Sequence, residues 1–350
     1  MVPDLQDNSL GRAYCLWLMA RELGWHADVL STRGSTLWAP LRGTEFADDC
    51  RLVAEAELSR ELGATRADVI VAVKAHPESF GLAETAASQL GVPLVLDYDD
   101  PDIEAVLSWK RFIRRIARAA LRPKQVRQYQ QLASRAKLAP KIVSNPALAR
   151  RWGGVVIPHV RPLPPAQPSS KPQGGALRLV FVGTNRRHKG VPELRRAVKR
   201  LQVDGWTLTI TSPPPSDAAP WEHWVGYTSF EQGQRIIADA DVVAIPSRRS
   251  VFSAGQLPAK LIDAMVAGKA VVASDLEPIR WAAGDSAAYM RPGSTRDLIR
   301  QLRVLTSQEV RSNLGKRARE VAGLRFTVEG NAVLFEQVCR GAMAAARTGE

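Results

Sequence analysis

The sequence contains no run of about 18 apolar residues, so it predicts no helix that crosses a membrane. Its first residues also lack the basic and apolar blocks of a secretory signal. Cysteine is scarce: Cys15, Cys50 and Cys339 are far apart and odd in number, which does not suit a disulfide framework and fits a reducing compartment. Together these absences predict a cytoplasmic protein.

Acidic residues are outnumbered, since 35 Asp and Glu stand against 48 Lys and Arg, which gives a net charge of +13. Such a charge suits an anionic partner: nucleic acid, anionic lipid or a phosphorylated small molecule. Codon composition also produces arginine-rich chains, so the charge alone selects no partner. A hydrophobic content of 45% is that of a globular protein, and 350 residues favour two domains over one core.

Acids are missing altogether from residues 109–137, which hold ten Lys or Arg. Within this segment, residues 109–122 place apolar side chains at helical spacing between basic ones, a pattern typical of a basic amphipathic helix. One interpretation is peripheral contact with an anionic membrane at its inner face. The other, which we favour, is a surface helix that packs its apolar stripe on its own domain. We find no nucleic-acid-binding module, so a basic nucleic-acid-binding protein is a remote alternative and we expect no nucleic-acid partner.

Pro, Ser and Gly are concentrated in residues 161–175, which predicts an exposed linker. Strand-like apolar runs alternate with helical segments on both sides of it. These runs are 27–30, 68–73, 93–97, 141–144 and 154–158 in the first half, and 177–183, 207–210, 242–246 and 270–273 in the second. The pattern predicts an α/β protein with two Rossmann-like doubly wound domains facing across a cleft, at 1–160 and 176–326, and residues 327–350 packing back on the first domain.

A polar loop after the strand-like run 177–183 carries the clearest motif. It reads Gly183-Thr184-Asn185-Arg186-Arg187-His188-Lys189-Gly190 and leads into a helix. Glycine permits close approach of a ligand to the backbone, and Lys and Arg supply positive charge at the carboxyl end of a strand. The motif predicts a diphosphate site, with a solvated basic loop as the alternative.

The second motif spans residues 255–274. Pro258 suits the first position of a helix, so the residues before it, Ser253 to Leu257, would turn backbone donors toward a ligand. Asp263 lies five residues into that helix among apolar neighbours. Its carboxylate is able to accept the two hydroxyls of a ribose, whereas the alternative is an incidental acid on a core helix.

These two segments together resemble the retaining glycosyltransferases of family 4, which have the two-Rossmann-domain (B-type) fold. The family's Gly-Arg-x4-Lys-Gly stretch has the same spacing as Gly183-Thr184-x4-Lys189-Gly190. Residues 264–275 are similar to its Glu-Ala-Met-Ala-x-Gly-x-Pro-Val-Val-Ala-Ser stretch, and further similarities occur at 238–247, 284–293 and 325–327. The resemblance is strong over 176–330 and weak before 140.

The resemblance implies a metal-independent glycosyltransferase that moves a sugar, with retention, from a nucleotide-diphosphate sugar to a hydroxyl or amine of a small molecule, saccharide or lipid. It implies no cofactor and no metal; UDP is the first expectation for the donor, and GDP, ADP or TDP stay open. The implied diphosphate-binding residues are Gly183, Thr184, Arg186, Arg187, Lys189, Gly255, Gln256 and Leu257. Asp263 would bind ribose, and Val225, Gly226 and Tyr227 would contact the base.

Three features depart from the family. Gly255 replaces the first glutamate of its Glu-x7-Glu pair, which leaves open a catalytically silent sugar-nucleotide-binding or partner-binding protein. The first strand is nearly missing, with only Val2-Pro3 as its tail. The run 213–215 is Pro-Pro-Pro in place of a glycine-rich turn.

The acceptor side is predicted from the ends of two strand-like runs in the first half. His76 follows the run 68–73, and Asp97, Asp99 and Asp100 end the run 93–97. We expect His76, Asp97 and Asp99 to be catalytic, by orienting the acceptor hydroxyl while the leaving diphosphate takes its proton. Alternatives are a loop histidine before Pro77 and, for the acids, a metal site.

Overall fold

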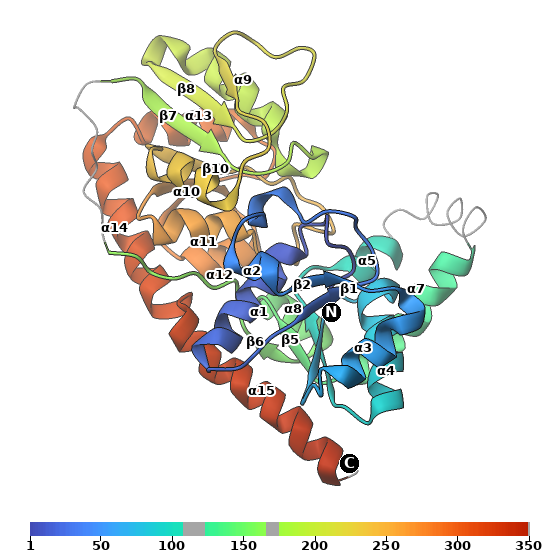
Figure 1. Ribbon diagram of the computed structural model, residues 1–350. Helices are drawn as coiled ribbons and strands as arrows, with labels where there is room; N and C mark the ends of the chain where they lie inside the picture. Colours follow the sequence, from blue (N-terminus) through green and yellow to red (C-terminus); the bar gives the residue numbers. More distant parts are fainter. Residues whose placement is uncertain (108–122, 166–174, 349–350) are drawn as a thin grey trace. The chain divides into compact units, whose positions relative to one another are not determined.

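A computed structural model describes residues 1–107, 123–165 and 175–348 (Figure 1). The chain divides into two compact units: unit 1 comprises Met1–His159 and Val328–Glu350, and unit 2 comprises Val160–Thr327. The basic amphipathic helix predicted at 109–122 lies outside the described residues, as do residues 166–174 of the predicted linker. No helix among the described residues is both long and apolar enough to cross a membrane.

Unit 1 is built on short parallel strands. In its described part, these are β1 (Val29–Ser31), β2 (Cys50–Leu52), β3 (Ile70–Val73), β4 (Leu94–Tyr98), β5 (Lys141–Val143) and β6 (Val155–Val156). Strands β3-β4-β5-β6 form one sheet in that order, and β1 pairs with β2 in another. The extended residues Met1 and Val2 connect the two, because Val2 N donates to Leu30 O (3.0 Å) and Val73 N donates to Met1 O (2.8 Å).

Helices surround these strands. They are α1 (Leu10–Glu22), α2 (Glu45–Asp48), α3 (Leu58–Ala64), α4 (Leu82–Leu90), α5 (Asp102–Leu107), α7 (Pro123–Leu138), α8 (Pro146–Trp152) and α15 (Val328–Thr348), with a short π-helical segment η3 (Pro77–Gly81) and the short 3₁₀ helices η1 (Ala39–Leu41) and η2 (Glu55–Glu57). Helix α15, the last in the chain, packs along α1, and the rings of Trp25 and Phe335 lie 5.9 Å apart.

Unit 2 contains one parallel sheet of six strands in residues 175–327, in the order β12-β11-β10-β7-β8-β9. The strands are β7 (Leu177–Phe181), β8 (Trp206–Ile210), β9 (Glu222–Trp224), β10 (Val242–Ile245), β11 (Ala270–Ser274) and β12 (Ala287–Met290). The helices are α9 (Val191–Leu201), α10 (Phe230–Ala238), α11 (Ala259–Val266), α12 (Glu277–Ala283), α13 (Thr295–Val304) and α14 (Gln308–Arg325), with the 3₁₀ segments η5 (Arg187–Lys189) and η6 (Gln202–Asp204). Figure 1 shows β7, β8 and β10 side by side in this sheet.

The alternation of side chains along a strand divides the core of unit 2 into two layers. Val243 and Ile245 of β10 pack with α11, α12 and α14 on one face. Val242 and Ala244 pack with α9 and α13 on the other. Because helices cover both faces, the central strands are apolar along their whole length, which is why the sequence shows continuous apolar runs there.

These features confirm the predicted α/β class with doubly wound parallel sheets. Three strands were not predicted: β2, β9 and β12. β2 and β9 are three residues long and lie at the edges of their sheets, and polar residues such as Glu222 and Arg51 break the apolar pattern. Helix α11 begins at Ala259, so Pro258 is its N-cap and not its first residue.

Candidate functional site

In unit 1, polar side chains gather where β3, β4 and β5 end. Parallel strands bring their carboxyl ends to one edge of the sheet, so residues that follow different strands become neighbours there. Lys74 follows β3, Asp99 follows β4 and Ser144 follows β5. Ser144 Oγ donates to the carbonyl oxygen of Asp99 (2.7 Å), which ties the last two strand ends together.

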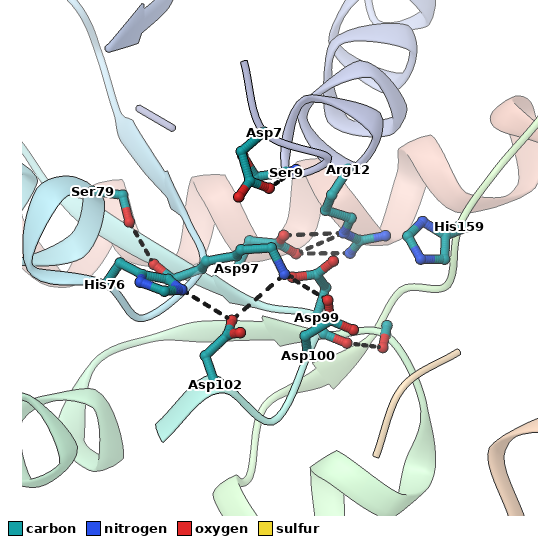
Figure 2. Close-up of polar contacts among 12 residues, drawn as sticks. Asp7, Ser9, Arg12, His76, Ser79, Asp97, Asp99, Asp100, Asp102 and His159 are labelled. Atoms are coloured by element: carbon teal, nitrogen blue, oxygen red, sulfur yellow. Dashed lines mark hydrogen bonds and ion pairs between the residues drawn. The ribbon is translucent and has the colours of Figure 1, made fainter. Parts of the chain in front are cut away.

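The Lys74 ammonium is the centre of a buried charge cluster. Its Nζ lies 3.2 Å from Asp99, 2.6 Å from Asp100 and 3.5 Å from Asp102, and all four side chains are almost completely buried. Figure 2 shows the three carboxylates gathered around this contact. Lys74 holds a backbone φ of +67°, which is uncommon for a residue with a side chain and turns it out of the strand toward the acids.

Asp99 is buried beside other carboxylates, and this changes the pKa of its carboxyl group. Burial, with the neighbouring carboxylates of Asp100 and Asp97, raises the pKa of Asp99 to about 8, although Lys74 opposes the change. Asp99 therefore carries a proton near neutral pH. In that form the carboxyl group is able both to donate and to accept a hydrogen bond.

Asp97, predicted to be catalytic, lies inside β4 and is completely buried. Arg12 of α1 holds it with two nitrogens: Nε lies 3.0 Å from each carboxylate oxygen and Nη2 lies 2.7 Å from Oδ1. The remaining donors of Arg12 bind the carbonyl oxygens of Ile157 and Pro158. This arrangement joins α1, β4 and the end of β6, so it supports a structural role for Asp97 rather than contact with an acceptor (Figure 2).

His76 lies beside the cluster and is partly exposed. Its Nδ1 is 2.8 Å from the hydroxyl of Tyr129. Its Nε2 is 3.6 Å from a carboxylate oxygen of Asp102, a contact that Figure 2 shows. A ring held from both sides in this way has a fixed orientation. The structure therefore brings His76 and Asp99 to the same edge, connected through Asp102 and Lys74.

A second polar group stands at the start of α1. The Oγ of Ser9 is buried and has no hydrogen-bond partner among the described residues. The backbone N–H of Ser9 donates to a carboxylate oxygen of Asp7 (2.8 Å). A buried hydroxyl without a hydrogen-bond partner is costly and uncommon in folded proteins. In the described part of the chain no group of acids, histidines and cysteines is arranged to hold a metal, and in the Asp cluster the Lys74 ammonium takes the central place.

In unit 2, the predicted phosphate loop lies where β7 ends. Gly183 N donates to Thr211 Oγ1 (2.7 Å) and Asn185 N donates to Ser212 Oγ (3.3 Å), so the end of β8 fixes the path of the loop. Arg186 and Arg187 are exposed, whereas Lys189 is half-buried at the end of η5. The loop thus directs Lys189, and not the two arginines, toward the interior of the unit.

Gly190 sets how closely this loop approaches β10. It has a left-handed φ of +75°, and a Cβ at this position would collide with the carbonyl oxygen of Pro246 at the end of β10. Next to it, Arg248 N donates to His188 O (2.8 Å), and the Arg248 side chain pairs with Glu193 of α9. These contacts hold the phosphate loop against the segment that follows β10.

The segment 248–257 forms the other side of the predicted diphosphate site. Lys189 Nζ donates to the side-chain oxygen of Gln256 (2.7 Å), which joins the two predicted diphosphate-binding segments. The amides of Gly255 and Gln256 donate to the carbonyl oxygen of Phe252 (3.1 and 2.8 Å), and Leu257 is buried in the core. Of this segment, it is therefore the Gln256 side chain that reaches the lysine.

Asp263, the predicted ribose ligand, is buried and paired. Its Oδ1 accepts from Arg161 Nε (2.6 Å) and from Gln234 Nε2 (3.2 Å), and the Arg161 guanidinium also lies over the ring of Phe230. Arg161 is the first residue of the predicted linker, yet it is 6% exposed and its N–H donates to Phe326 O. No sequence pattern indicates this partner, because Arg161 stands in a stretch rich in proline.

The predicted base-contacting residues follow the edge strand β9. Val225 and Tyr227 are 47% and 67% exposed, and Gly226 between them has a φ of +72° with open space where a side chain would stand. Val225 N donates to Ile210 O (3.0 Å), which fixes this turn to β8. The exposed Tyr227 ring is therefore available for stacking on a base. Thr184, another predicted ligand of the diphosphate, is half-buried in the loop after β7.

Sequence reasoning missed several residues that lie at the candidate sites. They are Lys74, Asp102, Tyr129 and Arg12 at the strand ends of unit 1, and Lys260 of unit 2, whose Nζ lies next to Gly183. The sequence marks Lys74 because it follows an apolar run. The residues next to it in the chain do not show that three acids surround its ammonium group. Lys260 lies within the second motif at the start of α11, where it reads as an ordinary basic residue of an amphipathic helix. Tyr129 falls in the basic stretch 109–137, whose composition directed attention to charge.

A cavity of about 560 Å³ also lies within unit 1. Residues of α1, α15, β1 and β3 line it, including Trp17, Trp25 and Phe335, with Arg340 among them. No residue of the predicted acceptor site lines this cavity, so the chemistry-bearing groups are elsewhere, at the carboxyl ends of the strands.

The chain is similar to known proteins in part of its sequence and in its fold. The family profile described as Glycosyl transferases group 1 matches residues 176–308, which hold the phosphate loop, the segment 248–257 and Asp263. Comparison with curated protein sequences gives no match.

Solved structures of similar fold cover nearly the whole chain. HepE of Anabaena in complex with UDP-glucose has a TM-score of 0.74 at 14% identity, over 97% of this chain and 98% of its own. Sucrose-phosphate synthase of Thermosynechococcus elongatus has 0.69 at 16%, over 95% and 93%. WaaG, a glycosyltransferase involved in lipopolysaccharide biosynthesis, has 0.63 at 14%, over 93% and 95%. The chain therefore has the B-type glycosyltransferase fold of two Rossmann-like domains, and its residues 176–308 match the group 1 glycosyl transferases.

Proposed function

We propose that this protein transfers a sugar from a nucleotide-diphosphate sugar to an acceptor hydroxyl, with retention of the anomeric configuration. The observation that carries the proposal is the hydrogen bond from Lys189, in the loop after β7, to Gln256. Both residues lie within the segment that matches group 1 glycosyl transferases. In this class of fold, phosphates bind at the carboxyl ends of the parallel strands, where an ammonium group is able to pair with them. UDP is the first choice for the nucleotide, since HepE was solved with UDP-glucose.

In the proposed reaction, the acceptor oxygen bonds to the anomeric carbon as the bond from that carbon to the diphosphate oxygen breaks. The acceptor proton passes to the leaving diphosphate. The charge that develops on the diphosphate is stabilised by Lys189, which is a preorganised cation in this site. Asp263 binds ribose through its second carboxylate oxygen, since Oδ1 is held by Arg161 and Gln234.

Unit 1 supplies the acceptor site in this proposal. His76, oriented by Tyr129 and Asp102, and the protonated Asp99 position the acceptor hydroxyl. Asp97 acts as a positioning residue, because both of its oxygens are occupied by Arg12. A saccharide, a lipid or a small molecule with hydroxyl groups fits this polar edge. TarM, another protein of similar fold, was solved with Fondaparinux, α-GlcNAc-glycerol and UDP (TM-score 0.62).

A second function is favoured by one observation, the glycine at 255. Gly255 is buried and its amide donates to Phe252 O, so this position offers no side chain to the donor sugar. A catalytically silent protein that binds sugar nucleotides would keep the diphosphate site and lose turnover.

Titration separates these functions. The chain is titrated with UDP, GDP, ADP and TDP and their sugars, and then assayed for donor hydrolysis and transfer to a panel of acceptors. We expect saturable binding of one nucleotide, a loss of about 1–3 kcal/mol in Lys189→Ala, and no loss in the exposed control Lys199→Ala. Binding without any turnover would favour the silent protein, and equal affinity in Lys189→Ala would contradict the proposed site.

A further inference from the structure

Lys260 stands in the first turn of α11, and its side chain reaches back to the end of β7. Its Nζ lies 4.3 Å from the centre of the Phe181 ring. The same nitrogen occupies the space above Gly183, where a Cβ would collide with it. The ammonium group is therefore placed at the strand end that begins the phosphate loop, and the glycine at 183 makes room for it.

The positive charge of the Lys260 ammonium is not balanced by an acid paired with it in the described part of the chain. Lys260 forms no ion pair with any described residue, and its side chain is half-buried. The acid that acts on it, Asp263, gives its Oδ1 to Arg161 and Gln234. Lys189 is the other charged group that acts on it, and it is also a cation. Two ammonium groups thus share the end of β7, and one of them, Lys260, has no acid paired with it among the described residues.

We propose that Lys260 is a second cation of the diphosphate site, and that its ammonium binds the same pyrophosphate group as Lys189. This inference rests on the proposed function, since the pyrophosphate belongs to the sugar nucleotide. Arg186 and Arg187, which the sequence favoured for this role, are exposed, whereas Lys260 lies against the glycine of the loop. A pyrophosphate has enough negative charge and oxygen atoms to accept from both lysines at once.

Binding of a pyrophosphate group next to Lys260 should also change the protonation of Lys260. Burial and the nearby charge of Lys189 lower the pKa of Lys260 well below its ordinary value, while Asp263 opposes the change. Phe181 carries no charge, and Arg161 is neutralised by Asp263. A pyrophosphate next to Nζ favours the charged form, so binding raises the pKa and takes up a proton wherever the empty site is neutral. The affinity should therefore fall as the pH rises.

Calorimetry measures both effects. UDP-glucose and inorganic pyrophosphate are titrated into the wild-type chain at a series of pH values from 6 to 9, in two buffers of different ionisation enthalpy. UDP-glucose reports the proton uptake, because its diphosphate has no proton to exchange in this range. We expect its heat of binding to depend on the buffer, in the direction of proton uptake, increasingly as the pH rises. In Lys260→Met the affinity for both ligands should fall tenfold or more, and the buffer dependence with UDP-glucose should disappear.

Two matched variants complete the test. Lys260→Arg should keep affinity within a few fold of the wild type but lose the proton uptake, because a guanidinium stays charged. Lys199→Met, on the exposed side of α9, should change neither quantity. Uridine lacks phosphate, so its binding should not depend on residue 260; an equal loss for uridine would show a structural role and overturn the inference.

The outcomes also separate this inference from the proposed function. Wild-type affinity for UDP-glucose and pyrophosphate in Lys260→Met overturns the role of Lys260 and leaves the glycosyltransferase proposal standing. Pyrophosphate binding that depends on Lys260 without binding of any sugar nucleotide supports the two-lysine anion site and contradicts the proposed donor. If the wild-type chain binds neither pyrophosphate nor any of the UDP, GDP, ADP and TDP sugars, both the inference and the proposed function are overturned.

Discussion

Arg161 and Asp263 form a buried ion pair in unit 2, in which the arginine Nε donates to the carboxylate Oδ1 over 2.6 Å. Gln234 donates to the same oxygen, and Oδ2 takes no hydrogen bond from the described residues. The carboxylate is thus oriented before any ligand arrives. A fixed acceptor of this kind binds a pair of vicinal hydroxyls at little cost in side-chain entropy.

Asp263→Asn should weaken the binding of the nucleotide. A hydrogen bond to a charged group contributes about 1.5–3 kcal/mol, so we expect a loss of that order for UDP and a smaller loss for 2′-deoxy-UDP. Isothermal titration of both ligands measures it. If the variant discriminated between the two ligands as the wild type does, Asp263 would not be the ribose ligand.

Arg12→Met should destabilise unit 1, because it leaves Asp97 buried without its partner. Breaking a buried pair on one side costs about 3–5 kcal/mol, and this should appear as a lower urea midpoint. The double variant Arg12→Met with Asp97→Leu removes both charges and should recover part of the loss. A single variant as stable as the wild type would disprove the structural role of this pair.

Asp99 should make the stability of the protein decrease with pH. Its pKa of about 8 in the folded state exceeds that of an unfolded aspartate, so between these values the folded chain holds a proton that the unfolded chain has lost. The free energy of unfolding should therefore fall from pH 5 to pH 8, by at most about 1.4 kcal/mol per pH unit. Asp99→Asn should flatten this dependence in urea unfolding series; an unchanged slope would show that another group causes it.

Gly190→Ala should impair the phosphate loop. The new methyl group meets the carbonyl oxygen of Pro246, and a left-handed backbone costs an alanine about 1–2 kcal/mol before that collision is counted. We expect lower thermal stability and weaker nucleotide binding. Gly205→Ala is the control, since Gly205 has a similar φ of +78° with nothing near its Cβ position. Equal losses in both variants would mean that the backbone conformation alone, and not the contact with Pro246, determines the effect.

Tyr227→Ala should weaken nucleotide binding through the loss of base stacking. Stacking of one base on an aromatic ring contributes about 1–3 kcal/mol, whereas Tyr227→Phe keeps the ring and should bind like the wild type. The measurement is the affinity for UDP and for inorganic pyrophosphate, which has no base. A loss that also occurs with pyrophosphate would rule out stacking as its cause.

The sequence by itself determined the class of fold, since apolar runs such as 242–245 must be covered on both faces and only a layered α/β arrangement does this. It also predicted a phosphate site in the loop from Gly183 to Gly190, because glycine and lysine are close together in the chain. Only the tertiary structure decided which charges meet. Lys74 and its three acids, Arg12 and Asp97, and Arg161 and Asp263 come from distant segments, and their pairing depends on the register of strands and the packing of helices, which no local pattern encodes.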